Sequence, residues 1–218
     1  MSYRFANRMD AGRVLAGQLR HLSGQPNLLV LALPRGGVPV AFQIAFELHA
    51  PLEIFLVRKL GVPWHEEFAM GAIASGGSYF LNDEVVQKLG IPQREIDGVI
   101  EREKAELLRR ELAYGQSLAK TQIENHTVIL VDDGLATGST MRAAIIALRQ
   151  QQPARIIVAV PVAAAATVRE MAREVDEIVC AYTPEPFLAV GEWYEDFSQT
   201  TDEEVRELLE RAGSLHAA

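Results

Sequence analysis

Apolar residues in this chain fall into short unbroken runs, and between the runs they recur with helical spacing. Short runs rich in Val, Ile and Leu are typical of strands buried on both faces of a parallel sheet. Such runs predict strands at 28–33, 53–57, 128–131, 156–160 and 177–181. Apolar residues at every third or fourth position predict helices near 10–22, 40–49, 96–114, 140–152, 163–174 and 201–213. This alternation predicts an α/β fold: a doubly wound, mainly parallel five-stranded sheet flanked by helices, in one domain over residues 1–218.

Two stretches depart from this alternation. Residues 60–95 are the least regular part of the chain, although Met70–Ala74 and Tyr79–Leu81 flank Ser75–Ser78 as the strands of a hairpin would. The chain from 183 to 198 has two prolines and several aromatic residues but no clear period. We therefore expect a hairpin insertion in the first stretch and extended, irregular chain in the second.

Local polar signals mark two of the helices. Thr201 and Glu204 have the spacing of a capping box at the start of the last helix, and Gly213 is expected to end that helix. Within the helix at 96–114, Glu106 and Arg110 are spaced for an ion pair one turn apart.

Composition narrows the possible partners. The net charge of −8, from 21 basic and 29 acidic residues, disfavours a surface for nucleic acid or for an anionic membrane. A single cysteine, Cys180, excludes an intrachain disulfide framework and a cysteine-based zinc site. The sequence has no signal peptide and no apolar span of membrane-crossing length, so we expect a cytoplasmic protein.

The most informative stretch is Val128–Met141. Its buried strand ends in Asp132 and Asp133, and a loop of small and hydroxyl residues then leads into a helix. Glycines allow a backbone to approach a phosphate closely, and a helix N-terminus attracts anions. A carboxylate that only caps the helix would explain one acidic residue here, but not two at the end of an apolar strand. A Walker loop is excluded, because the glycine spacing is wrong and no lysine follows.

This stretch resembles the phosphoribosyl-pyrophosphate (PRPP) motif of the type I phosphoribosyltransferases. The resemblance implies transfer of the 5-phosphoribosyl group from PRPP to a nitrogenous base in nucleotide salvage, with Mg²⁺ as cofactor. It gives Asp132 and Asp133 a catalytic role, and makes them metal ligands that act through water or the ribose hydroxyls. The residues it implies for substrate binding are Gly134, Leu135, Ala136, Thr137, Gly138, Ser139 and Thr140.

Two further polar clusters follow predicted strands. Arg35, Gly36 and Gly37 come after the first strand, and Arg58 and Lys59 after the second. Because parallel strands share one carboxyl edge, these clusters should converge with the acidic pair. The resemblance implies that Arg35 is catalytic, that Gly36 and Gly37 bind pyrophosphate, and that the Pro34–Arg35 peptide is cis. Arg58 and Lys59 are expected either to neutralise the same phosphates or to form a surface pair. It also implies a mobile loop over the site, for which residues 60–95 are the natural place.

The acceptor is addressed by one departure from the family pattern. Ala136 stands where relatives specific for 6-oxopurines carry an aspartate, so adenine or a less common planar base becomes the expected acceptor. A variable hood recognises the acceptor in this family. Here it would be built from residues 1–27 and 183–218 around a core at about 28–181, with Trp193 as the side chain expected to stack on the base. Packing of Trp193 in the core is the alternative.

Two other functions remain open from the sequence. One is a non-catalytic regulator that senses PRPP or a nucleotide on the same fold, and the other is a sugar-phosphate or nucleotide hydrolase with water as acceptor. In each case the expected partners are small molecules, PRPP and a planar base for the transferase, without nucleic acid or membrane. We also expect a homo-oligomer, most simply a dimer.

Overall fold

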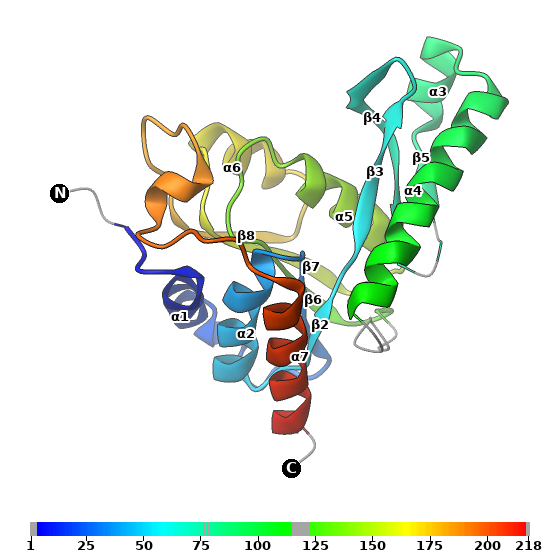
Figure 1. Ribbon diagram of the computed structural model, residues 1–218. Helices are drawn as coiled ribbons and strands as arrows, with labels where there is room; N and C mark the ends of the chain where they lie inside the picture. The colour runs from blue at the N-terminus through cyan, green and yellow to red at the C-terminus, as the bar shows by residue number, and fades with distance from the viewer. Residues whose placement is uncertain (1–3, 76, 78, 115–122, 217–218) are drawn as a thin grey trace.

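A five-stranded parallel sheet forms the centre of the computed structural model, which describes residues 4–75, 77, 79–114 and 123–216 (Figure 1). The strand order is β2-β1-β6-β7-β8, with every neighbouring pair parallel. The strands span β1 Leu28–Ala32, β2 Leu52–Ile54, β6 Thr127–Val131, β7 Arg155–Val162 and β8 Glu177–Tyr182. The predicted fold class is therefore confirmed, and β1 and β6 lie side by side near the middle of the sheet.

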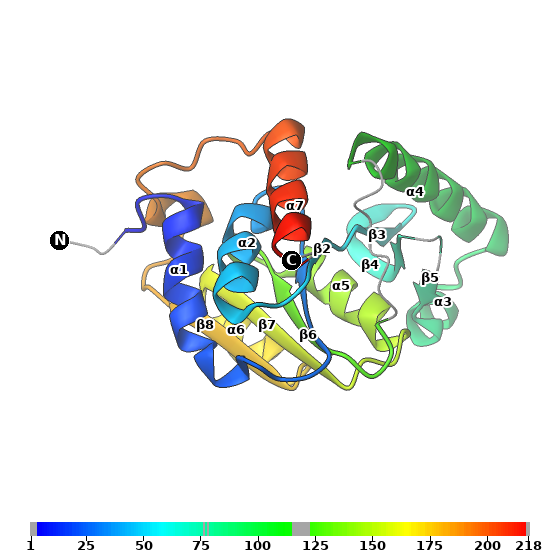
Figure 2. The same ribbon diagram turned by 90° about the horizontal axis from the view of Figure 1, so that it is seen from below.

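Helices cover both faces of this sheet. Alternate strand residues point to opposite faces, so Val30 and Ala32 pack in one core cluster and Leu29 and Leu31 in another. The first face is covered by α1 (Arg8–Gln18), α2 (Gly37–Leu48) and α7 (Asp202–His216), which Figure 2 shows side by side. The second is covered by α5 (Ser139–Arg149) and α6 (Ala165–Met171). Single 3-10 turns lie at η1 (Arg20–Leu22) and η3 (Val190–Trp193).

A second, smaller sheet interrupts the core between β2 and β6. We call residues Val57–Tyr114 the insertion; it comprises β3 (Val57–Val62), β4 (His65–Ala74), β5 (Tyr79–Leu81), α3 (Asp83–Leu89) and α4 (Gln93–Tyr114). Its strands are antiparallel in the order β3-β4-β5. The insertion projects from the core (Figure 1), and β3 and β4 pack against α5 while α4 contacts α7.

The insertion corrects three sequence expectations. The predicted strand at 53–57 is divided, because β2 ends at Ile54 and β3 begins at Val57. Arg58 and Lys59 consequently lie within β3 of the small sheet rather than at the carboxyl edge of a core strand. The predicted hairpin is confirmed as β4–β5, but the rest of 60–95 is regular rather than irregular and includes the unexpected helix α3.

Side chains cap the starts of α1 and α7, and the second of these caps was predicted. Asn7 caps α1 by accepting the amide of Asp10, and Thr201 and Glu204 form the predicted reciprocal box at the start of α7. Glu106 pairs with Arg110 as expected, and also with Arg109. Gly213, however, does not end α7, which continues to His216.

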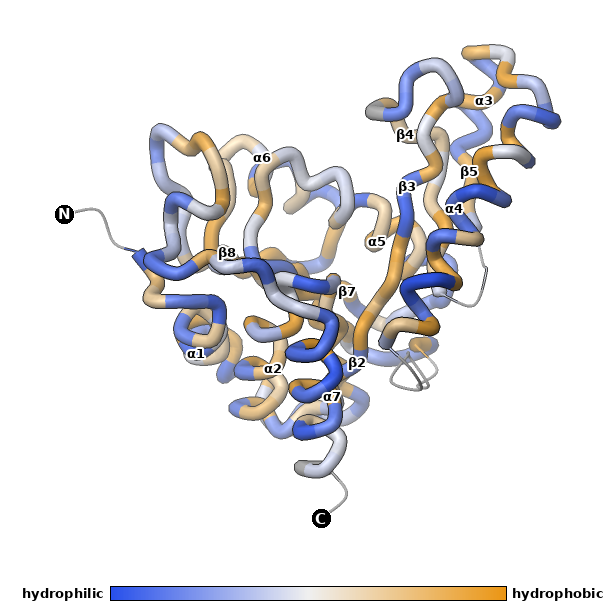
Figure 3. Tube along the Cα trace, viewed as in Figure 1, coloured by the Kyte–Doolittle hydropathy of each residue, from blue (hydrophilic) through white to orange (hydrophobic). Residues whose placement is uncertain are grey.

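Hydropathy along the chain matches this layered arrangement. In Figure 3 hydrophobic and hydrophilic residues alternate along α4, as expected for a helix with one covered face. Among the residues that the structure describes, no helix is both long and apolar enough to cross a membrane.

Candidate active site

Two turns meet at the carboxyl edge of β1 and β6. The turn Pro34–Gly37 follows β1, and Asp132–Thr140 follows β6, so strand pairing alone brings them together. The Leu33 amide donates to the Val131 carbonyl at 2.9 Å, which continues the pairing into the turns. A side chain at Gly37 would lie 2.6 Å from the same carbonyl oxygen, so the close approach requires glycine. The Pro34–Arg35 peptide is cis, as predicted.

The loop after the acidic pair ends at a helix N-terminus. Gly138 adopts a left-handed conformation (φ 71°), and α5 begins at Ser139. The hydroxyls of Thr137 and Ser139 lie 3.1 Å apart, and Thr137 and Thr140 are exposed. Hydroxyls and the positive end of the helix dipole at this loop are features that favour a phosphate group.

Side chains of α5 and α6 hold this loop by hydrogen bonds to its backbone carbonyls. Thr167 of α6 donates to the Ala136 carbonyl at 2.8 Å, and Arg142 of α5 donates to the Thr137 carbonyl at 3.1 Å. Arg142 is itself fixed by Glu170 at 2.8 Å and Glu174 at 3.0 Å. With its carbonyls bound on this side, the loop is arranged before any ligand arrives.

The acidic pair is partly buried and asymmetric. Asp132 accepts the Asp133 amide at 2.8 Å, whereas the Asp133 carboxylate accepts from Nε of Arg8 at 2.8 Å. Burial, followed by the adjacent Asp133 charge, raises the pKa of Asp132 well above its usual value. Burial also raises the pKa of Asp133, and the hydrogen bond from Arg8 opposes that shift.

Arg8 is the principal residue that the sequence did not indicate. It precedes any recognisable motif and lies 125 positions from Asp133 in the chain. The one local signal in this segment is Asn7, the N-cap of α1, which directly precedes Arg8.

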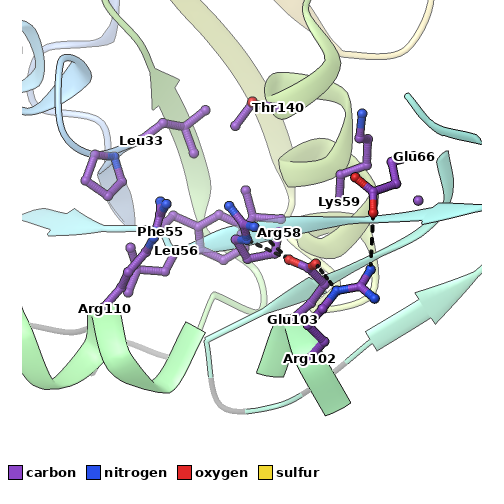
Figure 4. Close-up of a pocket in the computed structure, with 13 residues that line it drawn as sticks. Leu33, Phe55, Leu56, Arg58, Lys59, Glu66, Arg102, Glu103, Arg110 and Thr140 are labelled. Atoms are coloured by element: carbon purple, nitrogen blue, oxygen red, sulfur yellow. Dashed lines mark hydrogen bonds and ion pairs between the residues drawn. The ribbon is translucent and has the colours of Figure 1, made fainter. Parts of the chain in front are cut away.

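The predicted cationic residues Arg58 and Lys59 line a cavity that neither aspartate of the acidic pair lines. Arg58, Lys59 and Thr140 line a cavity of about 350 Å³ between core and insertion, together with Leu33 and Pro34 (Figure 4). The pocket is rich in charged side chains, several of them paired. Figure 4 shows Arg58 joined to Glu103 and Arg102 joined to Glu103 and Glu66; the Arg58–Glu103 distance is 2.8 Å.

Among the described residues, the Arg35 side chain is held only by a long ion pair. Its side chain is 37% exposed, and its Nη1 lies 3.8 Å from the Asp202 carboxylate at the start of α7. A pair of this length and exposure contributes little to stability, so the side chain can exchange partners at low cost.

Trp193 lies in the aromatic part of the expected hood. Its ring centroid is 5.4 Å from that of Tyr182, and its indole nitrogen is buried without a hydrogen-bond partner among the described residues. The neighbouring Tyr194 donates its hydroxyl to the Asp133 carbonyl at 2.6 Å. Val190 fills the space beside Gly134, where a Cβ would approach Cγ1 of Val190 at 2.5 Å. The segment that contains Val190 and Tyr194 thus contacts the acidic motif directly, while its role as a hood and the stacking of Trp193 on a base stay predictions.

The donor set suits a metal that is shared with a substrate. No group of three or more His, Cys, Asp or Glu side chains that could hold a metal ion occurs in the described part of the chain. Mg²⁺ commonly keeps several waters and binds one or two carboxylates together with substrate phosphates. Two adjacent carboxylates beside a phosphate loop fit that mode of binding.

Comparisons with known proteins agree with this geometry. The family model "Phosphoribosyl transferase domain" matches residues 4–183. A Mycobacterium tuberculosis protein named "Putative phosphoribosyl transferase Rv0571c" is 43% identical over 208 residues, which cover 95% of this chain and 47% of that protein. The chain thus spans about half the length of the curated relatives it matches. The crystal structure of TT1426 from Thermus thermophilus superposes with a TM-score of 0.87 at 39% identity, covering 94% of this chain and 97% of that one.

Proposed function

This chain belongs to the phosphoribosyl transferase family, and from that premise we propose that it transfers the 5-phosphoribosyl group of PRPP to a nitrogenous base and releases pyrophosphate. The observation that carries the proposal is the placement of a phosphate loop, an acidic pair and a glycine turn at one edge of the sheet. Each of these three features suits one part of PRPP.

The 5′-phosphate is assigned to the loop from Leu135 to Thr140, where α5 begins. The ribose hydroxyls are hydrogen-bond donors, and they suit the carboxylates of Asp132 and Asp133. Pyrophosphate is assigned to the turn of Arg35, Gly36 and Gly37, through the Arg35 guanidinium; the Gly37 amide already donates to the Leu33 carbonyl at 3.1 Å. A single extended ligand could therefore span the edge from α5 to the cavity beneath the insertion.

Charge development explains why these residues would favour reaction. As pyrophosphate leaves, positive character grows on the sugar and negative charge grows on the leaving group. The carboxylate of Asp132 would stabilise the sugar, and cationic side chains such as Arg35, Arg58 and Lys59 would stabilise pyrophosphate. Mg²⁺, held through Asp132 and Asp133 by way of water or ribose hydroxyls, would supply further neutralisation of the pyrophosphate oxygens.

The acceptor that we propose is adenine or a less common planar base. Ala136 provides no carboxylate for the N7 proton of a 6-oxopurine, and its carbonyl is already bound by Thr167. The aromatic residues of the hood offer flat surfaces for a heterocycle, and Trp193 is the proposed stacking residue.

A kinetic assay with PRPP and Mg²⁺ tests the proposal. Pyrophosphate release is measured with adenine, hypoxanthine, guanine and other planar bases, and without any base. Release that depends on a base is the expected result. Equal release without a base would indicate a hydrolase, and PRPP binding without any release would indicate a regulator.

For the acceptor, efficient transfer to hypoxanthine or guanine would contradict the interpretation of Ala136. Trp193→Ala should raise the KM for the base and leave that for PRPP nearly unchanged, whereas Trp193→Phe, which keeps a flat ring, should behave more like the wild type.

A further inference from the structure

Arg8 joins three segments that are far apart in the chain. Its Nε donates to the Asp133 carboxylate at 2.8 Å, and its Nη1 donates to the Ser198 carbonyl at 2.7 Å. Its guanidinium carbon lies 4.0 Å from the centroid of the Phe197 ring and 5.9 Å from that of Tyr194. The side chain is only 11% exposed. A guanidinium held by a carboxylate, a carbonyl and an aromatic face has little freedom to reorient.

Asp133 is confined on its other side by the turn after β1. A Cβ at Gly36 would collide with the Asp133 carboxylate and would lie 3.2 Å from Nε of Arg8. The backbone carbonyl of Asp133 is also occupied, since it accepts the Tyr194 hydroxyl at 2.6 Å. Asp133 is therefore wedged between the glycine turn, Arg8 and the hood.

Asp132 has different surroundings. The single hydrogen bond to its side chain among the described residues comes from the Asp133 amide, at 2.8 Å. Because that amide belongs to the residue that Arg8 fixes, the orientation of Asp132 depends on the position of Asp133. Asp133 has one carboxylate oxygen engaged by Arg8, whereas Asp132 has no arginine partner among the described residues.

We propose that Arg8 is a positioning residue for the acidic pair: it holds Asp133 between the glycine turn and the hood, and thereby aims Asp132 at the ribose of PRPP. Arg8 acts through Asp133 and does not itself contact the substrate. The inference rests on the proposed function, because it presupposes that PRPP binds at this edge of the sheet.

Compensation of charge gives a physical reason for the arrangement. Two adjacent carboxylates at a partly buried site repel each other, and an unpaired one would turn away or take up a proton. The arginine lets both stay beside each other in a fixed geometry. It also makes the segment before α1 part of the site, although that segment contributes no group to the reacting atoms.

Three ligands separate this role from the alternatives. Ribose 5-phosphate contains the sugar without pyrophosphate, metal-free pyrophosphate contains the leaving group without the sugar, and PRPP contains both. Dissociation constants for each are measured by titration calorimetry with the wild type, Arg8→Met and Arg8→Lys. Arg13→Met serves as the matched control, since Arg13 is an exposed arginine of the same helix.

If Arg8 positions the acidic pair, Arg8→Met should weaken ribose 5-phosphate and PRPP by a similar factor, on the order of tenfold. Binding of metal-free pyrophosphate should stay unchanged, and Arg13→Met should match the wild type for all three ligands. Arg8→Lys keeps the charge but not the planar fork, so it should recover only part of the loss.

Other outcomes overturn the inference. Weaker pyrophosphate binding in Arg8→Met would show that Arg8 binds pyrophosphate directly. Unchanged binding of all three ligands would show that Arg8 only stabilises the packing of the hood. Should Arg8→Met fail to fold, wild-type affinities in Arg8→Lys would be equally decisive against positioning. Failure of the wild type itself to bind PRPP would instead remove the proposed function.

Discussion

At the scale of single residues, Asp132 and Asp133 have the same side chain but different surroundings. Asp133 has an arginine partner, whereas Asp132 has burial and a neighbouring charge without a cation in direct contact. Since the folded protein raises the pKa of Asp132, its charged form opposes folding at neutral pH. We interpret that cost as the consequence of holding a carboxylate ready for a sugar hydroxyl.

Asp132→Asn should therefore lower kcat by about 10²-fold or more while raising the melting temperature. A raised folded-state pKa means that the destabilisation by the charge is present above that pKa and disappears at low pH, where the wild type is protonated. The gain in melting temperature should accordingly vanish on acidification. Thermal melts of both proteins across pH, beside the kinetic assay, check this. A lower melting temperature at neutral pH would show that the carboxylate stabilises the fold.

The exposed hydroxyls of the phosphate loop lead to a second expectation. Thr137→Ala and Thr140→Ala should each weaken PRPP binding by about 1–2 kcal/mol, because each removes one donor to a charged oxygen. Their effect on thermal stability should be small, since both residues are exposed. Calorimetric titration with PRPP makes the comparison, and an unchanged affinity would place the 5′-phosphate elsewhere.

At the scale of elements, the loop after β6 depends on α6 behind it. Thr167→Val preserves the shape of the side chain but removes the donor to the Ala136 carbonyl, so PRPP affinity should fall by about 1 kcal/mol. Thr127→Val is the matched control. It removes another buried threonine hydroxyl, which accepts from Gln25 at 3.0 Å, at the opposite end of β6. Both variants should lose some stability, but only Thr167→Val should alter the KM for PRPP. A KM for PRPP that is the same in Thr167→Val and in the wild type would contradict the supporting role of α6.

Elements of this kind differ in how far sequence predicts them. Apolar runs predict the core strands, and a local motif predicts the phosphate loop, so both could be predicted from the sequence. The strand β3 could not be predicted in this way, because Arg58, Lys59 and Gly61 interrupt its apolar pattern. Its pairing partners in the small sheet determine its structure. Gly213 did not end α7, since a glycine is tolerated within a helix when the flanking turns continue.

The contacts that complete the site are the least predictable. Arg8 and Asp133 meet only because α1 packs on the same face as α2, which brings the start of the chain over the end of β6. Nothing local in the sequence around Arg8 distinguishes it from other arginines near helix starts. Tertiary contacts between distant segments carry no periodic signal, and a single sequence cannot supply them.

At the scale of the whole molecule, the charged cavity joins core and insertion. Pro34 and Thr140 line it from the core, while Arg58 and Arg102 line it from the insertion (Figure 4). A ligand that bound both sides would restrict their relative motion.

Hydrogen exchange can test this link. PRPP with Mg²⁺ should slow the exchange of amides in β3 and β4, because its pyrophosphate would reach the cationic residues of the insertion. Ribose 5-phosphate, which lacks pyrophosphate, should protect the loop before α5 and leave β3 and β4 unaffected. Identical protection patterns for the two ligands would show that the insertion takes no part in binding.

The position of the insertion also governs how the chain reaches its native structure. β1 pairs with β2 through a short crossover, but its other neighbour, β6, arrives only after the entire insertion has been synthesised. The antiparallel strands of the insertion are close in sequence and form local contacts, which generally assemble sooner than distant parallel pairs. The antiparallel pairs of the insertion can thus form while β1 still has an open edge towards solvent. The phosphate loop and the acidic pair, which follow β6, take their native positions beside the turn after β1 only once β6 has paired with β1.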